Sequence, residues 1–161
     1  MRYDKRYFYK SKVEFEDCDM QGIVHHPKFL CFLERARLSA LEEENIKYSD
    51  LINHDIGFAI TDISTKFVKP LKFEDSFFVM TEIESIYKNY VKIYQTISSK
   101  IFDDKNLICD KNVFSHTCIR LCIINITDMT PVDITNKILS KLNLKENQGN
   151  IKDINMKHPY N

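Results

Sequence analysis

The stretch Phe15–Arg37, FEDCDMQGIVHHPKFLCFLERAR, places several ionisable side chains beside an apolar run. Asp19 lies shortly before a predicted helix, and His26 stands directly before Pro27. Proline favours the first helical turn, because its missing N–H would be unpaired there. The backbone N–H of His26 is therefore expected near a helix N-terminus, where partial positive charge gathers. A carboxylate near such a donor suits acyl transfer: the carboxylate attacks or activates water, and the N–H stabilises the developing oxyanion.

The same spacing is open to other interpretations. A solvated capping loop would have the same residue types. The paired aspartates and paired histidines suggest a metal site, but adjacent residues rarely point to one centre, and no further ligand cluster stands out. Cys18 beside a histidine is a conceivable nucleophile, but in an extended segment its side chain faces away from Asp17 and Asp19. We therefore expect neither a metal nor a cofactor.

The residues from Pro27 to about Asn45 predict one long helix. At about 100° per residue, Glu34 falls among leucines on the apolar face, away from the polar stripe. Arg37 follows three residues later, close enough to pair with Glu34. Two interpretations stay open: a structural ion pair at a dimer interface, or a polar group that lines or supports a site. The polar stripe consists of Lys28, Arg35, Ser39 and Glu42.

The rest of the chain predicts an antiparallel sheet around this helix. Lys12–Asp17 alternates polar and apolar residues, as a short strand does. After Gly57, four segments rich in β-branched and aromatic residues follow, with tight turns at Lys88–Asn89 and Asp103–Asn106. Such turns make neighbouring strands antiparallel, and an apolar helix should be wrapped by the sheet. We predict an α+β fold, with one long central helix in a curved antiparallel sheet. The four segments, expected as a meander, are Phe58–Pro70, Ser76–Tyr87, Tyr90–Phe102 and Leu107–Ile126, and short helices are expected at Ser49–His54 and Pro131–Leu144.

Composition narrows the class of protein further. The 161 residues, 43% of them apolar, fit one domain, expected over 1–146, with a polar tail over 147–161. The 23 basic and 23 acidic residues balance, which argues against a large nucleic-acid surface. No run of roughly 18 uncharged apolar residues predicts a membrane span, and the first residues lack the apolar segment of a signal peptide. Five cysteines without a Cys-x-x-Cys pair indicate reduced thiols in a cytoplasm.

The opening stretch resembles the signature of hotdog-fold acyl-CoA thioesterases of the 4-hydroxybenzoyl-CoA thioesterase and YbgC type. That pattern runs Asp-x-Asp-x-x-Gly-x-Val, one variable residue, then His or an aromatic residue, followed later by Phe-x-Glu-x-Ala-Arg. Two positions depart from it: His25 stands where the family often has an aromatic residue, and Phe29 where tyrosine is usual. The matching positions are Asp17, Asp19, Gly22, Val24, His26, Phe32, Glu34, Ala36 and Arg37.

The resemblance implies a hotdog fold, a sheet wrapped around one helix. It implies dimers, often paired into tetramers, with active sites at the subunit interface. Asp19 would be the nucleophile or the general base toward a thioester, and the N–H of His26 would polarise the thioester carbonyl. Glu34 would be a helix residue close to the site.

The resemblance also implies an acyl-CoA as substrate, with an acyl thioester of acyl carrier protein as the alternative. Gly22, Val24 and His25 are expected to contact it. Lys88, in a predicted hairpin turn, is a candidate for the phosphates of a coenzyme. A non-catalytic module that binds acyl thioesters is the alternative function, and the presence of Asp19 argues against it.

Overall fold

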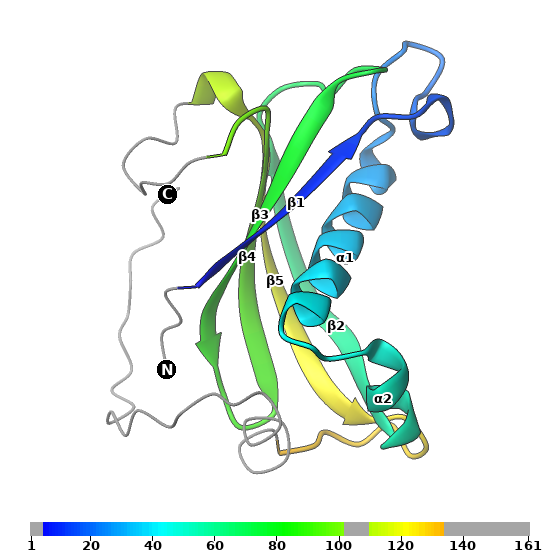
Figure 1. Cartoon of the computed structure of the whole chain (residues 1–161), viewed down its shortest axis with the longest axis vertical. Helices are drawn as coiled ribbons and strands as arrows, with labels where there is room; N and C mark the ends of the chain where they lie inside the picture. The colour runs from blue at the N-terminus through cyan, green and yellow to red at the C-terminus, as the bar shows by residue number, and fades with distance from the viewer. Residues whose placement is uncertain (1–4, 102–109, 134–161) are drawn as a thin grey trace.

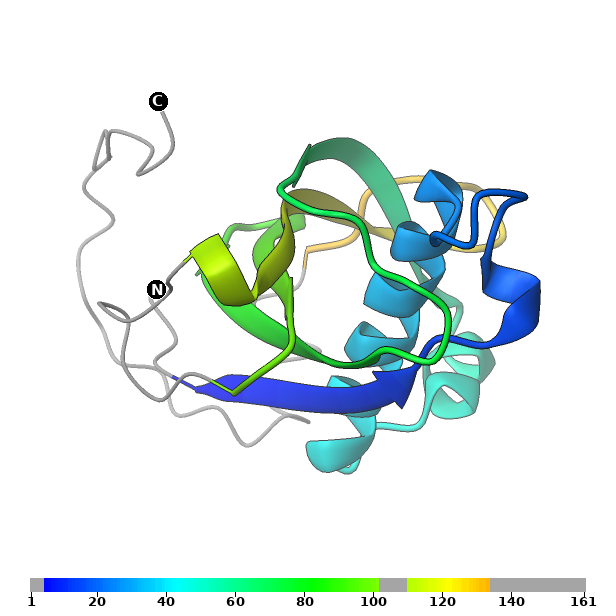
Figure 2. The same cartoon turned by 90° about the horizontal axis from the view of Figure 1, so that it is seen from above.

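The structure is a computed structural model that describes residues 5–101 and 110–133. Its strands form one antiparallel sheet in the order β1-β3-β4-β5-β2, and α1 lies against one face of that curved sheet (Figures 1 and 2). This confirms the predicted α+β architecture. The elements are β1 (Arg6–Lys12), η1 (Phe15–Asp17), α1 (His26–Glu43), α2 (Tyr48–Asn53), β2 (Ile56–Phe67), β3 (Ser76–Ile86), β4 (Tyr90–Ser98), η3 (Asp110–Asn112) and β5 (Val113–Asn125).

The pairing of β2 differs from the predicted meander. β3, β4 and β5 are neighbours in chain order, but β2 pairs with β5 and lies at an edge of the sheet. A β-bulge between Ile60 and Asp62 interrupts that pairing. Alternation and composition identify strands but carry no information about long-range partners, which is why the prediction was wrong here.

The predicted strand Lys12–Asp17 is also wrong beyond its first residue. β1 ends at Lys12, and Phe15–Asp17 forms a 3₁₀ turn. The backbone N–H of Glu14 donates to Asp17 Oδ2 at 3.0 Å, so a local side-chain contact replaces the sheet hydrogen bonds. The predicted Asp103–Asn106 turn, the Pro131–Leu144 helix and the tail lie outside the described residues.

The core forms where one face of α1 meets the concave face of the sheet. Proline near the helix start and a left-handed Asn45 (φ 59°) just past its end delimit α1, as both residue types commonly do. The buried residues of α1 are Phe29, Phe32, Leu33 and Ala36, and those facing them include Phe77, Val79, Ile97 and Ile119.

A buried polar contact fixes α1 on the sheet. Gln95 of β4 is only 1% exposed, and its Nε2 donates to the Leu33 carbonyl and to Thr81 Oγ1, both at 2.9 Å. Its Oε1 accepts a hydrogen bond from Arg37 Nη1 at 2.8 Å. One side chain therefore ties the helix backbone, a helix side chain and a neighbouring strand together.

Among the helices within the described ranges, none is long and apolar enough to cross a membrane.

Candidate active site

The residues between η1 and α1 fold into a short hairpin, Asp17–His25, which we call the acid hairpin. The His25 N–H donates to the Asp17 carbonyl at 2.9 Å, and the Asp19 N–H donates to the Ile23 carbonyl at 2.9 Å. The turn is closed by the Gly22 N–H on the Asp19 carbonyl at 3.0 Å, and Gly22 has φ +74°, which glycine adopts without steric cost. The hairpin delivers the chain directly into the first turn of α1.

Asp17 and Asp19 have different environments on this hairpin. Asp17 is 3% exposed, and its carboxylate accepts the Glu14 N–H and lies 3.3 Å from Lys28 Nζ. Its surroundings fix the hairpin against the helix. The expectation that both aspartates share one face of a strand is therefore wrong, because the 3₁₀ turn rotates Asp17 inward.

Asp19 lies at the turn and is partly exposed. Its Oδ1 accepts the Gln21 N–H at 2.8 Å, as aspartates in turns commonly do. Its Oδ2 accepts no hydrogen bond from the described part of the chain. The carboxylate thus has one oxygen that holds the turn and one that is open to water or to a substrate.

His26 begins α1, and its backbone N–H donates to no acceptor within residues 5–101 and 110–133. The first N–H groups of a helix have no partner inside the helix. In the hairpin register Asp17 lies opposite His25 and Asp19 opposite Ile23. The Asp19 backbone is thus two to three residues from the helix start, about 7–10 Å at 3.3 Å per residue.

A hollow of about 310 Å³ adjoins the helix start. Val24 and His26 line it, so the acid hairpin and the first turn of α1 share one recess. Phe67 and Lys69 also line this recess, and no pattern in the sequence predicts them there. Lys69 Nζ donates to the Lys111 carbonyl, which positions that cation beside the recess. The remaining lining residues are Ile23, Phe29, Val68 and Pro70.

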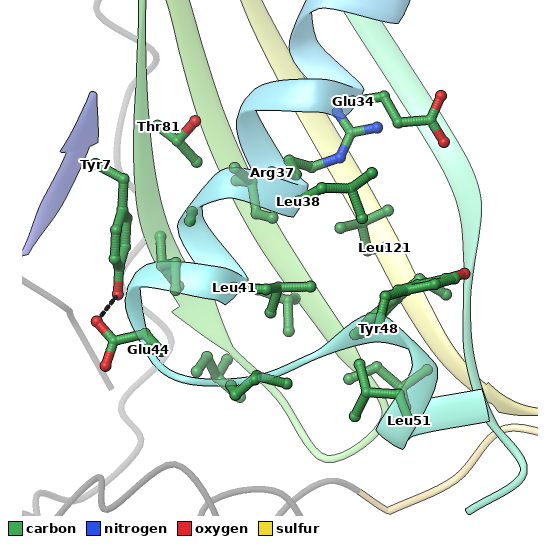
Figure 3. A pocket seen from close by; sticks show the side chains of 18 of the residues that line it. Tyr7, Glu34, Arg37, Leu38, Leu41, Glu44, Tyr48, Leu51, Thr81 and Leu121 are labelled. Atoms are coloured by element: carbon green, nitrogen blue, oxygen red, sulfur yellow. Dashed lines mark hydrogen bonds between the residues drawn. The ribbon is translucent and has the colours of Figure 1, made fainter. Parts of the chain in front are cut away.

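Glu34 is exposed in the single chain, on α1 between the exposed Leu30 and Leu38. Glu34 and Arg37, both among the described residues, form no ion pair within 4.0 Å, and Arg37 Nη1 donates to Gln95 Oε1 instead. Burial lowers the pKa of Arg37, and the charge of Glu34 opposes that shift. Figure 3 shows both side chains on α1. The charge of Glu34 thus influences Arg37 without a direct ion pair between the two side chains.

The two remaining predicted substrate contacts, His25 and Lys88, lie at different ends of the folded chain. His25 is exposed, and its ring lies 4.8 Å from the ring of His26, next to the recess. Lys88 is in the β3–β4 turn, at the α2 end of the molecule (Figure 1), and its Nζ lies 3.6 Å from Asp133 Oδ2. The structure does not bring Lys88 to the acid hairpin of the same chain.

The alternative chemistries find no support in this geometry. Burial, followed by the charges of Asp17 and Asp19, raises the pKa of the Cys18 thiol, which disfavours the reactive thiolate. Within the described ranges, no group of three or more His, Cys, Asp or Glu side chains is placed to hold a metal ion.

Comparison with known proteins identifies the class. Residues 13–143 match the model of the thioesterase-like superfamily, and the chain belongs to that family. It is similar to the acyl-CoA thioester hydrolase YbgC of Escherichia coli, with 28% identity over 75 residues, 47% of this chain and 56% of that protein. The chain thus matches little more than half the length of that relative.

Two further likenesses cover more of the chain. The acyl-CoA thioesterase YbgC of Haemophilus influenzae is 22% identical over 130 residues, 80% of this chain and 88% of that protein. The structure of a DHNA-CoA thioesterase from Staphylococcus aureus superposes with a TM-score of 0.72 at 15% identity, covering 84% of this chain and 85% of that one. The structural likeness confirms the predicted hotdog fold.

Proposed function

We propose that this protein hydrolyses an acyl thioester, with an acyl-CoA as substrate, to a free acid and a thiol. The observation that carries the proposal is the acid hairpin, which carries Asp19 and leads directly into the first residue of α1, His26, beside a recess. Family membership and the names of the relatives support the same reaction class.

We further propose that the protein acts in the cytoplasm, which rests on its odd number of cysteines.

The proposed chemistry needs one acid and one donor. The His26 N–H binds the thioester oxygen and stabilises the negative charge that develops there. As a general base, Asp19 takes a proton from water, the water oxygen attacks the carbonyl carbon, and the C–S bond breaks. The leaving thiolate receives that proton. As a nucleophile, Asp19 would itself attack the carbonyl carbon, break the C–S bond and form an anhydride with release of the thiolate; water would then cleave the anhydride to the free acid and supply the proton that the thiolate takes up.

Other side chains have supporting roles in this proposal. Gly22 permits the turn that presents Asp19, and Val24 contributes an apolar wall to the recess. His25 faces solvent beside it, where it contacts the substrate. Lys88 would meet the coenzyme phosphates of a site on another copy, since it lies far from the acid hairpin of its own chain.

We also propose a homodimer, formed through the free edge of β2. Among the described strands, β2 pairs only with β5, and an unpaired edge is a template for another strand. Pairing of β2 with its own copy around a twofold axis is antiparallel and closed. It also covers an apolar face beside Glu34, so that the site lies between the two copies. That face consists of Leu30, Leu38, Ile60 and Phe67, which are 38%, 38%, 47% and 50% exposed. The further pairing of dimers into a tetramer stays a prediction.

A non-catalytic module that binds acyl thioesters is the second candidate. It is favoured by one observation: Asp19 Oδ1 already caps the turn through the Gln21 N–H, a role that needs no chemistry. In such a module Asp19 would be structural.

Thioester turnover tests the proposal. The purified protein is incubated with acetyl-, decanoyl-, palmitoyl- and benzoyl-CoA, and with decanoyl-acyl carrier protein, and free thiol is measured. Release above the rate with Asp19→Asn supports a thioesterase, and comparison of the two carriers identifies the preferred one. Absence of thiol release above the protein-free rate on every substrate would favour the binding module, whereas equal release by the parent and Asp19→Asn would remove Asp19 from the chemistry.

A further inference from the structure

One ion pair joins the acid hairpin to the first turn of α1. Asp17 Oδ1, at the base of the hairpin, lies 3.3 Å from Lys28 Nζ, and the Asp17 side chain is buried whereas that of Lys28 is 33% exposed. Neither side chain has a role in the proposed chemistry. Asp17 stands two residues before the proposed acid, Asp19, and Lys28 stands two residues after the proposed donor, His26. The ion pair therefore connects the two segments that carry the reacting groups.

A lysine at this position of a helix is electrostatically unfavourable by itself. The first turn of a helix carries partial positive charge, so acidic side chains are favoured there and cations are disfavoured. Lys28 is the third residue of α1, and the first turn of α1 contains no acidic side chain. Its ammonium group instead reaches the buried carboxylate of Asp17, where the attraction is less screened than in water. The contact with Asp17, rather than helix formation, thus accounts for a lysine at this position.

Asp17 connects three segments of the chain. Its carboxylate accepts the Glu14 N–H at 3.0 Å, which closes the 3₁₀ turn, and its backbone carbonyl accepts the His25 N–H at 2.9 Å, which closes the hairpin. The ion pair with Lys28 adds the first turn of the helix. A two-stranded hairpin is only marginally stable alone, so the shape of the acid hairpin depends on contacts of this kind.

The two strands of the acid hairpin are held by different contacts. The second strand is anchored to the segment after β2, because the Val24 N–H donates to the Leu71 carbonyl at 2.8 Å. The first strand, which carries Asp19, is tied to α1 by the Asp17–Lys28 pair. Without the lysine, the buried carboxylate would lack its counter-charge, and it would move toward water because an unpaired buried charge is strongly unfavourable. That movement would displace Asp19, two residues further along the same strand.

We propose that Lys28, acting through Asp17, is a positioning residue for thioester hydrolysis, because the ion pair sets the place of the Asp19 carboxylate relative to the His26 N–H. The inference rests on the proposed thioesterase function. Asp17 and Lys28, both among the described residues, do not line the recess at the helix start. The pair should therefore act on kcat rather than on substrate binding, since a displacement of the reacting groups by about 1 Å can cost about 10²-fold in rate.

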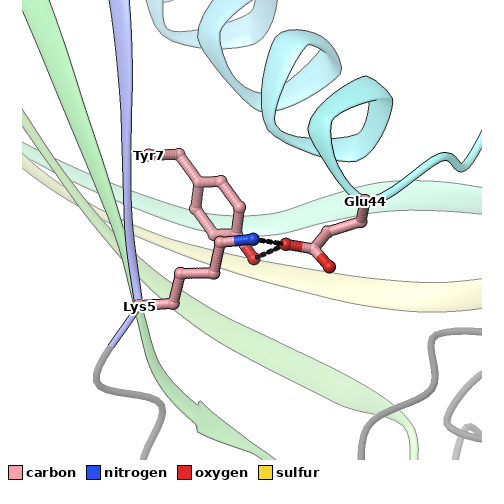
Figure 4. A network of polar contacts seen from close by, with 3 residues as sticks. All are labelled: Lys5, Tyr7 and Glu44. Carbon is pink, nitrogen blue, oxygen red and sulfur yellow. Dashed lines mark hydrogen bonds and ion pairs between the residues drawn. The ribbon is translucent and has the colours of Figure 1, made fainter.

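The other end of α1 offers a matched control. There Glu44 pairs with Lys5 and accepts a hydrogen bond from the Tyr7 hydroxyl at 2.9 Å (Figure 4). Tyr7 and Glu44 close one end of an apolar cavity of about 270 Å³, which the second half of α1, α2 and the sheet enclose (Figure 3). Lys5→Met removes an ion pair from the end of α1 that is remote from the acid hairpin. It therefore reports what the loss of such a contact does to the helix in general.

Steady-state kinetics of Lys28→Met on the best thioester is the first experiment. Methionine keeps the apolar stem of the side chain and removes its charge. We expect kcat to fall about 10–10²-fold with KM changed less than about twofold, whereas Lys5→Met should keep the parental kcat. Lys28→Arg should return kcat to within about threefold of the parent, because a guanidinium also pairs with a carboxylate. Circular dichroism checks the fold of each variant, and Lys28→Gln replaces Lys28→Met if the latter fails to fold. A parental kcat without the lysine, or a raised KM at parental kcat, would overturn the proposal.

A double variant that combines Asp17→Asn with Lys28→Met tests whether the lysine acts through Asp17. Changes that remove the same contact are not additive, whereas independent changes are. The double variant should therefore have about the kcat of Asp17→Asn alone. Losses in kcat that multiply would mean that Lys28 influences the reaction by another route, and that result would also overturn the proposal.

Amide hydrogen exchange separates this proposal from the proposed function, because it needs no turnover. The N–H groups of Asp19, Gly22 and His25 are hydrogen-bonded within the hairpin. Lys28→Met should raise their exchange rates about tenfold, as expected when a local opening becomes easier, and Lys5→Met should leave them at parental values. Parental exchange in Lys28→Met would overturn the positioning role even if thioesters are hydrolysed. Faster exchange together with a parent that hydrolyses no thioester would retain the contact and overturn the proposed function instead.

Discussion

The two ends of α1 differ in how they are built. At its start, the acid hairpin presents a carboxylate and a backbone donor with little around them. At its end, the helix, α2 and the sheet enclose an apolar cavity. The first region depends on residue types and spacing within one short stretch, whereas the second depends on residues far apart in the sequence. The chemistry that we propose depends on a local sequence, whereas the cavity is a product of the whole fold.

Asp19→Asn should have the largest effect and tests the first region. The nearly isosteric amide keeps the turn but removes the charge needed for attack or base catalysis. We expect kcat to fall about 10²–10⁴-fold, with KM little changed because the side chain acts mainly in the transition state. Steady-state kinetics on the best thioester provides the measurement. A kcat close to the parental value would remove Asp19 from the chemistry.

Gln95→Leu tests the polar contact that fixes the middle of α1, between its two ends, on the sheet. It leaves the half-buried Arg37 guanidinium and the buried Thr81 hydroxyl without this partner, at a cost of about 2–4 kcal/mol in the free energy of unfolding. Thr65→Val is the matched control, because Thr65 shares one hydroxyl contact with Thr117 at 3.1 Å across the same sheet. Urea unfolding of both variants is the measurement. Equal losses would mean that Gln95 is one polar contact among many.

Asp17→Asn sharpens the contrast between the two aspartates. The buried carboxylate loses its ion pair with Lys28, while an amide oxygen can still accept the Glu14 N–H. We expect a loss of about 2 kcal/mol in stability and a smaller effect on kcat than Asp19→Asn has. Thermal unfolding and kinetics on one preparation give both values. The assignment of the acid is wrong if Asp17→Asn is the more damaging to kcat.

Glu44→Gln tests the closed end of the cavity and should have the smallest effect. The hydrogen bond from Lys5, together with that from Tyr7, lowers the pKa of Glu44 below its usual value, although burial opposes the shift. The pKa of Glu44 is lower in the folded state than in the unfolded state, where it is about 4.3. The ionised carboxylate therefore stabilises the fold at pH values above the unfolded-state pKa, and this contribution is lost as the pH falls through the folded-state pKa. We expect the parent to exceed Glu44→Gln by about 1 kcal/mol at neutral pH, and the difference to vanish in acid. Urea unfolding across pH measures it, and a difference that persists in acid would assign it to packing.

The same contrast explains what the sequence could predict. Pro27 and the long apolar run identify α1 and the loop that precedes it, because helix signals are local. The strands after Gly57 are recognisable by composition, but the β2–β5 pairing is not. Asp17 was misplaced because its contact with Glu14 competes with strand geometry. The cavity and Gln95 were not anticipated, since no pattern in the sequence relates Leu51 to Ile83 or Gln95 to Leu33.

The bulge in β2 has a consequence for solubility. A long, straight edge strand invites further chains to add without limit, which leads to fibrous aggregates. The register shift between Ile60 and Asp62 kinks and twists this edge. Only a short straight segment beyond the bulge is then suited to pairing with another copy. The irregularity thus favours an association that stops at two chains over one that continues.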